Sequence, residues 1–194
     1  GMIPFVIISA GAYLAGSVNF AIILFAVLGK GDPRSGFSGN AGATNVRRQA
    51  GLGWAALVLL LDLIRAAALS FAALYFLPKG MAPWVALALV LGNRFPCFHG
   101  FQGGKGVAAY LGFTIPLAPY AAALFALAWV AVYGIGRIPF IASFGMVAVL
   151  AAGTVIASGY DAAAATGAVA TASFIYLNHR QNVSDLLHGK PETS

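Results

Sequence analysis

Long apolar segments, separated by short polar ones, make up most of the chain. Ile3–Leu28 and Trp54–Leu77 are each long enough to cross a bilayer, which takes about 20 residues of α-helix. Further apolar segments follow, and the first two of them are short: Pro83–Leu91, Val107–Leu117, Ala121–Tyr133, Ile138–Ala157 and Ala162–Leu177. The pattern predicts an all-α integral membrane protein, a single domain over residues 1–194 with about seven transmembrane helices.

The short segments carry functional meaning of their own. A helix of about 12 residues rises about 18 Å, which is too little for a hydrocarbon core of about 30 Å. Irregular backbone at membrane depth is tolerated only where it packs inside protein or lines a polar cavity. The polar stretch Gly92–Gly106, which lies between the two short segments, is the best candidate for such a recess.

The composition supports a membrane protein. The chain is 60% hydrophobic and 8% charged, whereas a soluble domain carries about 25% charged residues. A single cysteine, Cys97, excludes an intramolecular disulfide. The first apolar segment is too long for a signal-peptide core and lacks a basic leader, so we expect it to remain in the mature protein. The net charge of +6 is spread along the chain, which favours topology and anion binding over nucleic acid.

The basic residues indicate an orientation. With seven crossings, Lys79 falls alone on one side and Arg65 lies within a span. If Val107–Tyr133 were one crossing, the basic residues near the C-terminus would move to the side of Lys79. Seven crossings keep the basic residues together, so the N-terminus is predicted outside and the C-terminus in the cytoplasm. The basic residues then placed in the cytoplasm are Lys30, Arg34, Arg47, Arg48, Arg94, Lys105, Arg137, Arg180 and Lys190.

Three polar islands interrupt the apolar pattern. The first, KGDPRSGFSGNAGATNVRR over residues 30–48, places glycines and small polar residues between basic ones. Glycines let successive backbone N–H groups converge on an anion, and arginine adds a two-pronged donor for phosphate. A flexible cytosolic loop is the alternative, and we favour an anion site. The small hydrogen-bonding groups are Ser35, Gly36, Ser38, Gly39, Asn40, Gly42, Thr44 and Asn45.

The other two islands also carry groups suited to anions. In GNRFPCFHGFQGGKG, residues 92–106, glycines 103, 104 and 106 surround Lys105. The spacing differs from a Walker loop, because Val107 stands after Gly106 and no strand is predicted before it. In NHRQNVSDLLHGKPE, residues 178–192, His179 and Asn182 are three apart and share one helical face, with Arg180 between them.

One charged pair lies inside a predicted span. Asp62 and Arg65 are three residues apart and therefore share a helical face. Charges in the membrane are costly and tend to pair, so we expect an ion pair that braces the helix bundle. The remaining acidic residues and the histidines show no spacing that suits a metal. Neither a metal nor a cofactor is predicted.

In order and spacing, the three islands resemble the motifs of the bacterial membrane family of acyl-phosphate:glycerol-3-phosphate acyltransferases. The matching stretches are residues 38–48, 95–108 and 179–192. The resemblance implies a single seven-helix acyltransferase domain in the bacterial inner membrane, with all three motifs facing the cytoplasm. It implies transfer of a fatty acyl group from a long-chain acyl phosphate to the 1-hydroxyl of glycerol 3-phosphate. Lysophosphatidic acid and phosphate would be released, in the first step of phospholipid synthesis.

The resemblance also implies roles for individual residues. Lys105 and Arg48 would hold phosphate groups, helped by backbone N–H groups near Gly39 and Gly103–Gly104. His179 would help to place glycerol 3-phosphate and is a candidate general base, although the leaving phosphate is an alternative proton acceptor. Ser38 as an acylated nucleophile would need a neighbouring base. Catalytic roles are expected for Ser38, Arg48, Lys105, His179 and Asn182, and substrate or phosphate binding for Gly39, Asn40, Thr44, Asn45, Gly103, Gly104, Gly106 and Arg180.

Some positions depart from the family pattern. The family's usual residues are proline at Asn19, glycine at Phe37, lysine at Arg65, histidine at Asn93 and arginine at Asp185. A diverged member that uses another donor or acceptor therefore stays open as an alternative, as does a small-anion transporter or channel. A transporter needs polar groups in both membrane halves, whereas here they gather on one side. We expect a monomer that contacts membrane lipid.

Overall fold

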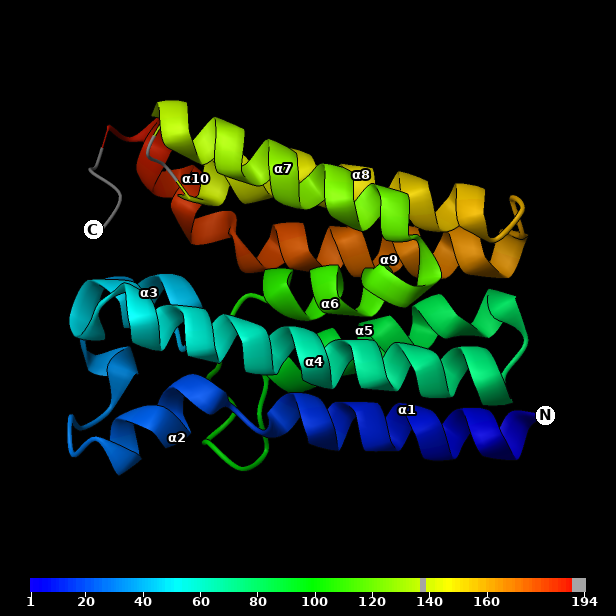
Figure 1. The fold of residues 1–194 in the computed structure, drawn as a ribbon, viewed down its shortest axis with the longest axis horizontal. Helices are drawn as coiled ribbons and strands as arrows, with labels where there is room; N and C mark the ends of the chain where they lie inside the picture. The colour runs from blue at the N-terminus through cyan, green and yellow to red at the C-terminus, as the bar shows by residue number, and fades with distance from the viewer. Residues whose placement is uncertain (137–138, 190–194) are drawn as a thin grey trace.

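The computed structural model describes residues 1–136 and 139–189, and the regular elements of that part are all helical (Figure 1). The all-α prediction is confirmed. Arg137 and Lys190, which were used to predict the orientation, lie outside the described residues. The predicted segments correspond to α1 (Met2–Ser17) with α2 (Phe20–Val27), α4 (Leu52–Phe76), α5 (Ala82–Arg94), α6 (Val107–Leu117), α7 (Pro119–Gly136), α8 (Pro139–Ala157) and α9 (Ala162–Asn178).

The helices have the character of membrane spans. Three stretches of the described chain are long and apolar enough to cross a bilayer: Met2–Val27, Leu52–Phe76 and Pro139–Ala157. Large apolar side chains such as Ile3 and Leu127 face outward, as a lipid-exposed surface requires. The start of the first helix and the last described residues lie at opposite ends of the long axis (Figure 1), in keeping with an odd number of crossings. The count of seven and the orientation remain predictions.

Glycine lets α1 and α5 cross at backbone contact. A Cβ atom on Gly16 would lie 2.3 Å from the Leu89 carbonyl oxygen, and one on Gly92 would lie 2.1 Å from that of Tyr13. Small residues at such crossings bring helices together in a membrane, where van der Waals packing replaces the hydrophobic effect. This crossing fixes α1 against α5, whose end leads into the second polar island.

The first span is interrupted, whereas the sequence predicted one continuous helix over Ile3–Leu28. α1 ends at Ser17, and Asn19 has an extended backbone (φ −98°, ψ 109°) before α2 begins at Phe20. The Asn19 side-chain oxygen accepts the N–H of Ile22 at 3.0 Å. Asparagine is among the strongest helix N-caps. Asn19 therefore starts α2 as a new helix, and the backbone hydrogen bonds of α1 do not continue through it.

Arg65 of α4 satisfies the carbonyl groups that the interruption exposes. Its guanidinium donates to the carbonyl oxygens of Ala15, at 3.3 Å, and of Val18. It also pairs with Asp62 at 2.7 Å and lies 5.0 Å from the Phe20 ring centroid. The predicted ion pair is confirmed. An unpaired carbonyl in the membrane costs several kcal/mol (~2–7 for a polar group moved out of water). By donating to these carbonyls, Arg65 lowers the free-energy cost of interrupting the helix.

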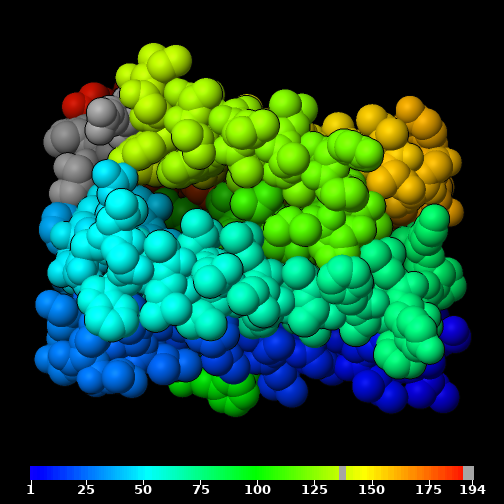
Figure 2. Space-filling model, in the orientation of Figure 1, coloured from blue at the N-terminus to red at the C-terminus, as the bar shows by residue number. Residues whose placement is uncertain are grey.

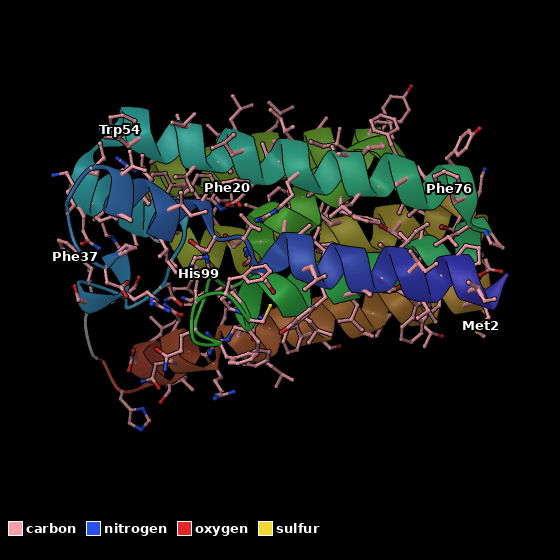
Figure 3. All side chains as sticks on the ribbon, turned by 90° about the horizontal axis from the view of Figure 1, so that it is seen from below. Met2, Phe20, Phe37, Trp54, Phe76 and His99 are labelled. Atoms are coloured by element: carbon pink, nitrogen blue, oxygen red, sulfur yellow. The ribbon has the colours of Figure 1, made fainter. Side chains whose placement is uncertain are left out.

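Asn19 links the break to two polar islands. Its side-chain amide donates to the Ala41 carbonyl at 3.0 Å, and its backbone N–H donates to Nε2 of His99 at 3.3 Å. The Ser17 hydroxyl accepts the N–H of Cys97 at 3.2 Å. Figure 3 shows Phe20 and His99 close to this break. The interruption therefore anchors the first and second islands to the helix bundle.

Short helices that the apolar pattern did not predict lie in the polar islands. α3 (Ala43–Ala50) and α10 (Arg180–Leu187) gather at the end of the molecule opposite the start of α1 (Figure 1). The single turn η1 (Pro33–Ser35) precedes α3 in the same region, and η2 (Lys79–Met81) joins α4 to α5 at the opposite end. The polar islands thus form one end of the bundle.

Replacing Arg65 by methionine is predicted to destabilise the protein strongly. The change leaves Asp62 as an unpaired buried charge and removes the Arg65 donor from the Val18 and Ala15 carbonyls, of which Ala15 keeps its bond from the Val18 N–H, at a cost of about 3 kcal/mol or more. That cost corresponds to a fall of roughly 10 °C in the melting temperature, measured by thermal unfolding in detergent. The double variant Asp62→Leu/Arg65→Met should recover part of the loss, because it removes the unpaired charge. An unchanged melting temperature in Arg65→Met would contradict this role.

Candidate active site

A cavity of about 460 Å³ opens at the polar end of the bundle. Figure 2 shows the hollow between the cyan surface of α3 and α4 and the yellow-green surface of α7, with α6 and the C-terminal segment at its floor. Polar residues of all three islands line one part of the cavity. Mostly apolar residues of α4, α6, α7 and α8 line the rest, with Asp62 and Ser143 as polar members. A single space therefore joins a polar site to an apolar groove.

Two helices begin at the polar part of the cavity. α3 follows Gly42 and α6 follows Gly106, and at neither start does a side chain of the described protein cap the first turn. Both glycines and the residues Ala43 and Val107 line the cavity. The first-turn N–H groups of a helix have no intrahelical partner and form the positive end of the helix dipole. Together, the two helix starts favour a bound anion.

Arg48 and Lys105 add positive charge to the same part of the cavity. The Lys105 ammonium group donates to the side-chain oxygen of Asn182. The Asn178 amide donates to the Lys105 carbonyl oxygen at 3.2 Å. These contacts bring the third island onto the second.

His179 is buried at the end of α9 with its ring held in one orientation. Its Nδ1 lies 2.8 Å from the Ile175 carbonyl oxygen, and its ring stands edge-on to Phe144 at 6.4 Å. Burial lowers the pKa of His179 to about 4; the Ile175 hydrogen bond opposes this shift and the charge of Lys105 adds to it. At neutral pH the ring is therefore uncharged. Donation from Nδ1 leaves Nε2 as the hydrogen-bond acceptor.

The glycines of the islands shape the site through packing. The N–H groups of Gly103 and Gly104 donate to the carbonyl oxygens of Arg94 and Asn93, both at 3.1 Å, and that of Gly39 donates to Gly36. A Cβ atom on Gly103 would lie 2.0 Å from the Asn93 carbonyl oxygen. These N–H groups were expected to hold phosphate, but they are engaged within the protein. The helix starts of α3 and α6 face the cavity in their place.

Asn45 holds the first island in shape. Its side-chain amide donates to the carbonyl oxygens of Pro33 at 2.8 Å, Gly36 at 3.2 Å and Asn40 at 2.9 Å. The Asn40 amide in turn donates to the Ser38 carbonyl at 2.9 Å. Asn45 and Asn40 thus order the loop that presents Ser38 to the cavity, whereas the sequence suggested that both orient substrate.

Most of the predicted site residues come together. Those that line the cavity are Ser38, Asn40, Thr44, Asn45, Arg48, Gly104, Lys105, Gly106, His179 and Asn182. Among the described residues, Gly39, Gly103 and Arg180 lie outside the lining. Asn93, which departs from the family pattern, lines the cavity. Asp185 instead accepts a hydrogen bond from Gln181 at 2.8 Å on the surface of α10.

The apolar groove was not predicted residue by residue. Its walls follow helical spacing, so that each helix contributes one stripe of side chains. An apolar side chain that faces a groove looks the same in the sequence as one that faces lipid, so no signal marked these positions. The lining residues are Leu52, Ala55, Ala56 and Leu59 from α4, Leu111 from α6, and Phe125, Ala126, Trp129, Val130 and Tyr133 from α7.

The arrangement suits an amphiphile with an anionic head. Helix N-termini, Arg48 and Lys105 attract phosphate, while the groove accepts an aliphatic chain that never needs to leave an apolar environment. The neutral ring of His179 and the hydroxyl of Ser38 lie on the polar part of the lining. The cavity therefore suits a phosphate group together with a long apolar tail.

Comparisons with known proteins agree with this site. The model of the glycerol-3-phosphate acyltransferase family matches residues 6–189. A glycerol-3-phosphate acyltransferase of Sinorhizobium medicae is 40% identical, over 91% of this chain and 86% of its own. One from Mesorhizobium japonicum is 38% identical, over 91% of this chain and 89% of its own.

A solved structure is also similar to this chain. PlsY, described as an integral membrane glycerol 3-phosphate acyltransferase, superposes in its glycerol 3-phosphate form with a TM-score of 0.87 and 32% identity, covering 96% of this chain and 93% of its own. Its lysophosphatidic acid form gives a TM-score of 0.84 at 31% identity, with the same coverage. The match to the family model covers nearly all of the chain, and it includes the first two polar islands and residues 178–189 of the third. The chain therefore belongs to the glycerol-3-phosphate acyltransferase family.

Proposed function

We propose that this protein transfers a fatty acyl group from an acyl phosphate to the 1-hydroxyl of glycerol 3-phosphate. The observation that carries the proposal is the single cavity in which an anion site continues into an apolar groove. The relatives named above are glycerol-3-phosphate acyltransferases, and PlsY has been solved with glycerol 3-phosphate and in a lysophosphatidic acid form. The products are lysophosphatidic acid and inorganic phosphate.

The two substrates divide the cavity between them. The acyl chain of the donor lies in the groove between α4 and α7, which brings its phosphate to the helix starts of α3 and α6 and to Arg48. Glycerol 3-phosphate enters from the polar end and is held by Lys105 and Asn182. Both phosphates meet positive charge without a metal ion, because the helix dipoles and the basic side chains supply it.

The reaction needs little beyond this positioning. The acceptor oxygen bonds to the acyl carbon, the bond from that carbon to the phosphate oxygen breaks, and phosphate leaves with the electron pair. Ser38 and the first N–H groups of α3 are placed to stabilise the negative charge on the carbonyl oxygen. Holding an activated donor beside its acceptor supplies much of the rate. The hydroxyl proton passes to neutral His179 or to the leaving phosphate.

The membrane setting follows from the same residues. The islands, with their basic side chains, form the end of the bundle that contains the cavity, and the positive-inside rule places that end in the cytoplasm. Glycerol 3-phosphate is water-soluble, while the donor and product stay in the membrane. A bacterial cytoplasmic membrane protein with its site facing the cytoplasm meets both needs. One chain carries all the groups named above, so a monomer suffices.

Phosphate release by the purified protein tests the function. Palmitoyl phosphate is supplied with and without glycerol 3-phosphate, and palmitoyl-CoA replaces it in a parallel reaction. We expect release that depends on the acceptor, equal yields of phosphate and lysophosphatidic acid, and no product from palmitoyl-CoA. Lys105→Met and His179→Ala should lower the rate by about 100-fold or more, as loss of a charged or proton-transferring group commonly does.

Two controls make the assay decisive. Lys79→Met removes a cation at the opposite end of the molecule and should keep full activity. Product formation from palmitoyl-CoA alone would show another donor class, and no turnover from folded wild-type protein with either donor would contradict the proposed reaction.

Keeping His179 neutral makes the folded state sensitive to acid. Its ordinary pKa is 6.5, and burial lowers the folded-state pKa to about 4. The unfolded chain therefore binds a proton that the folded chain rejects, so stability is complete above pH 6.5 and falls as the pH drops toward 4. The loss reaches about 3 kcal/mol. Melting temperatures from pH 8 to pH 4 should show this component in wild type and lack it in His179→Asn. Equal acid sensitivity in the two proteins would disprove it.

A further inference from the structure

Arg47 and Tyr133 make a contact that crosses the mouth of the cavity. The Arg47 guanidinium donates to the Tyr133 hydroxyl at 2.5 Å, and its central carbon lies 5.4 Å from the centroid of the Tyr133 ring. Both residues line the cavity. Arg47 belongs to α3 and Tyr133 to α7, which bound the hollow from opposite sides (Figure 2). The contact therefore joins the two walls above the groove.

On its α7 side the contact is held by further packing. The Tyr133 ring stacks on Trp129, with 5.0 Å between ring centroids and 21° between planes. Trp129 Nε1 donates to the Ser143 hydroxyl of α8 at 2.9 Å. Tyr133 is thus held through Trp129 to the neighbouring helix α8. The orientation of its ring is therefore set by packing that does not involve Arg47.

The two walls that this contact joins both pack on α6. α4, which continues from α3, packs extensively on α6, and α7 packs on α6 and α8. α6 lies between α4 and α7 in Figure 1. This arrangement leaves a groove between α4 and α7. Its floor is α6, and its open side faces outward. An Arg47–Tyr133 link across that side covers whatever lies in the groove.

The groove runs beneath this link. On α7 the lining residues Phe125, Trp129 and Tyr133 recur every four residues, and eight residues of α-helix rise about 12 Å. An aliphatic chain along this stripe reaches from the polar site, under Tyr133, to Phe125. The ring of Tyr133 and the carbon stem of Arg47 offer apolar surface to that chain, while the guanidinium stays at the polar rim.

We propose that Arg47 and Tyr133 form a clasp that determines how tightly the acyl donor is held in the groove. The inference rests on the proposed function, in which the groove holds the acyl chain. Because the clasp covers the chain and lies at the rim of the polar site, it acts on the donor and product and leaves glycerol 3-phosphate binding unaffected. Arg47 is next to Arg48 in the sequence but has a different role: Arg47 forms the clasp, whereas Arg48 binds the phosphate of the donor.

A double-mutant cycle on steady-state kinetics tests the clasp. Tyr133→Phe keeps the ring and removes the hydroxyl, and Arg47→Met keeps an apolar stem without the charge. Each should raise KM for palmitoyl phosphate by about five- to tenfold, as loss of a charge-assisted hydrogen bond does. KM for glycerol 3-phosphate should stay unchanged. The double variant should match the single ones, because either change alone opens the clasp.

Matched controls separate the clasp from general damage. Tyr120→Phe removes a hydroxyl from the exposed start of the same helix, and Lys79→Met removes a distant cation; both should leave the KM values unchanged. The clasp is overturned if both single variants keep the wild-type KM for palmitoyl phosphate, or if their effects multiply in the double variant.

A binding measurement distinguishes failure of the clasp from failure of the proposed function. Hexadecyl phosphate has the chain and phosphate but cannot transfer an acyl group, and its binding is followed by tryptophan fluorescence, since Trp129 lines the groove. Binding that weakens by about five- to tenfold in Tyr133→Phe supports the clasp even if the wild-type protein shows no acyl transfer. Equal binding by wild type and both variants overturns the clasp even if acyl transfer is confirmed.

Discussion

The interruption of the first spanning helix at Val18 and Asn19 is the constraint on which the site depends. Inside a membrane every exposed carbonyl needs a partner, and Arg65 provides one from α4 while Asp62 balances its charge. Once the backbone is free of the helix, Asn19 can bind the Ala41 carbonyl and His99. A buried ion pair, which adds little to stability by itself, here allows a polar crosslink at the base of the site.

This crosslink determines where the anion site forms. Ala41 directly precedes the start of α3, and its N–H donates to the Gly103 carbonyl at 3.4 Å, just before the start of α6. The two helix N-termini are thereby placed beside one cavity with Lys105 and Arg48. Beyond them the lining becomes apolar, so that one space serves a charged head and a hydrocarbon chain. An anion channel would need polar groups to continue along this path, and Phe125 and Trp129 occupy it instead.

The sequence predicted the helices well because apolar length is the main signal in a membrane protein. It missed the break because Asn19 stands alone within an apolar run, and its partners Ala41 and His99 are distant in sequence. It singled out Lys105, His179 and Asn182, which line the cavity, because polar residues are conspicuous in such a chain. The groove and the clasp were not predicted, because both depend on which side of α7 faces the cavity and the sequence does not show this. The glycine N–H groups were misassigned because their carbonyl partners come from folding.

Phe37, where the family usually has glycine, adopts a left-handed backbone (φ +50°) that favours glycine.

The affinity of Asn19→Ala for hexadecyl phosphate, whose phosphate group is assigned to the start of α3, tests the central claim most directly. Asn19 lies outside the cavity lining, so its side chain acts on the ligand indirectly, through its hydrogen bonds to Ala41 before α3 and to Ile22 in the first turn of α2. Calorimetric titration of the purified variant should show binding about tenfold weaker than wild type, from loss of the link to Ala41. Wild-type affinity in a folded Asn19→Ala protein would contradict the account, because the anion site would then form without the crosslink at the broken helix.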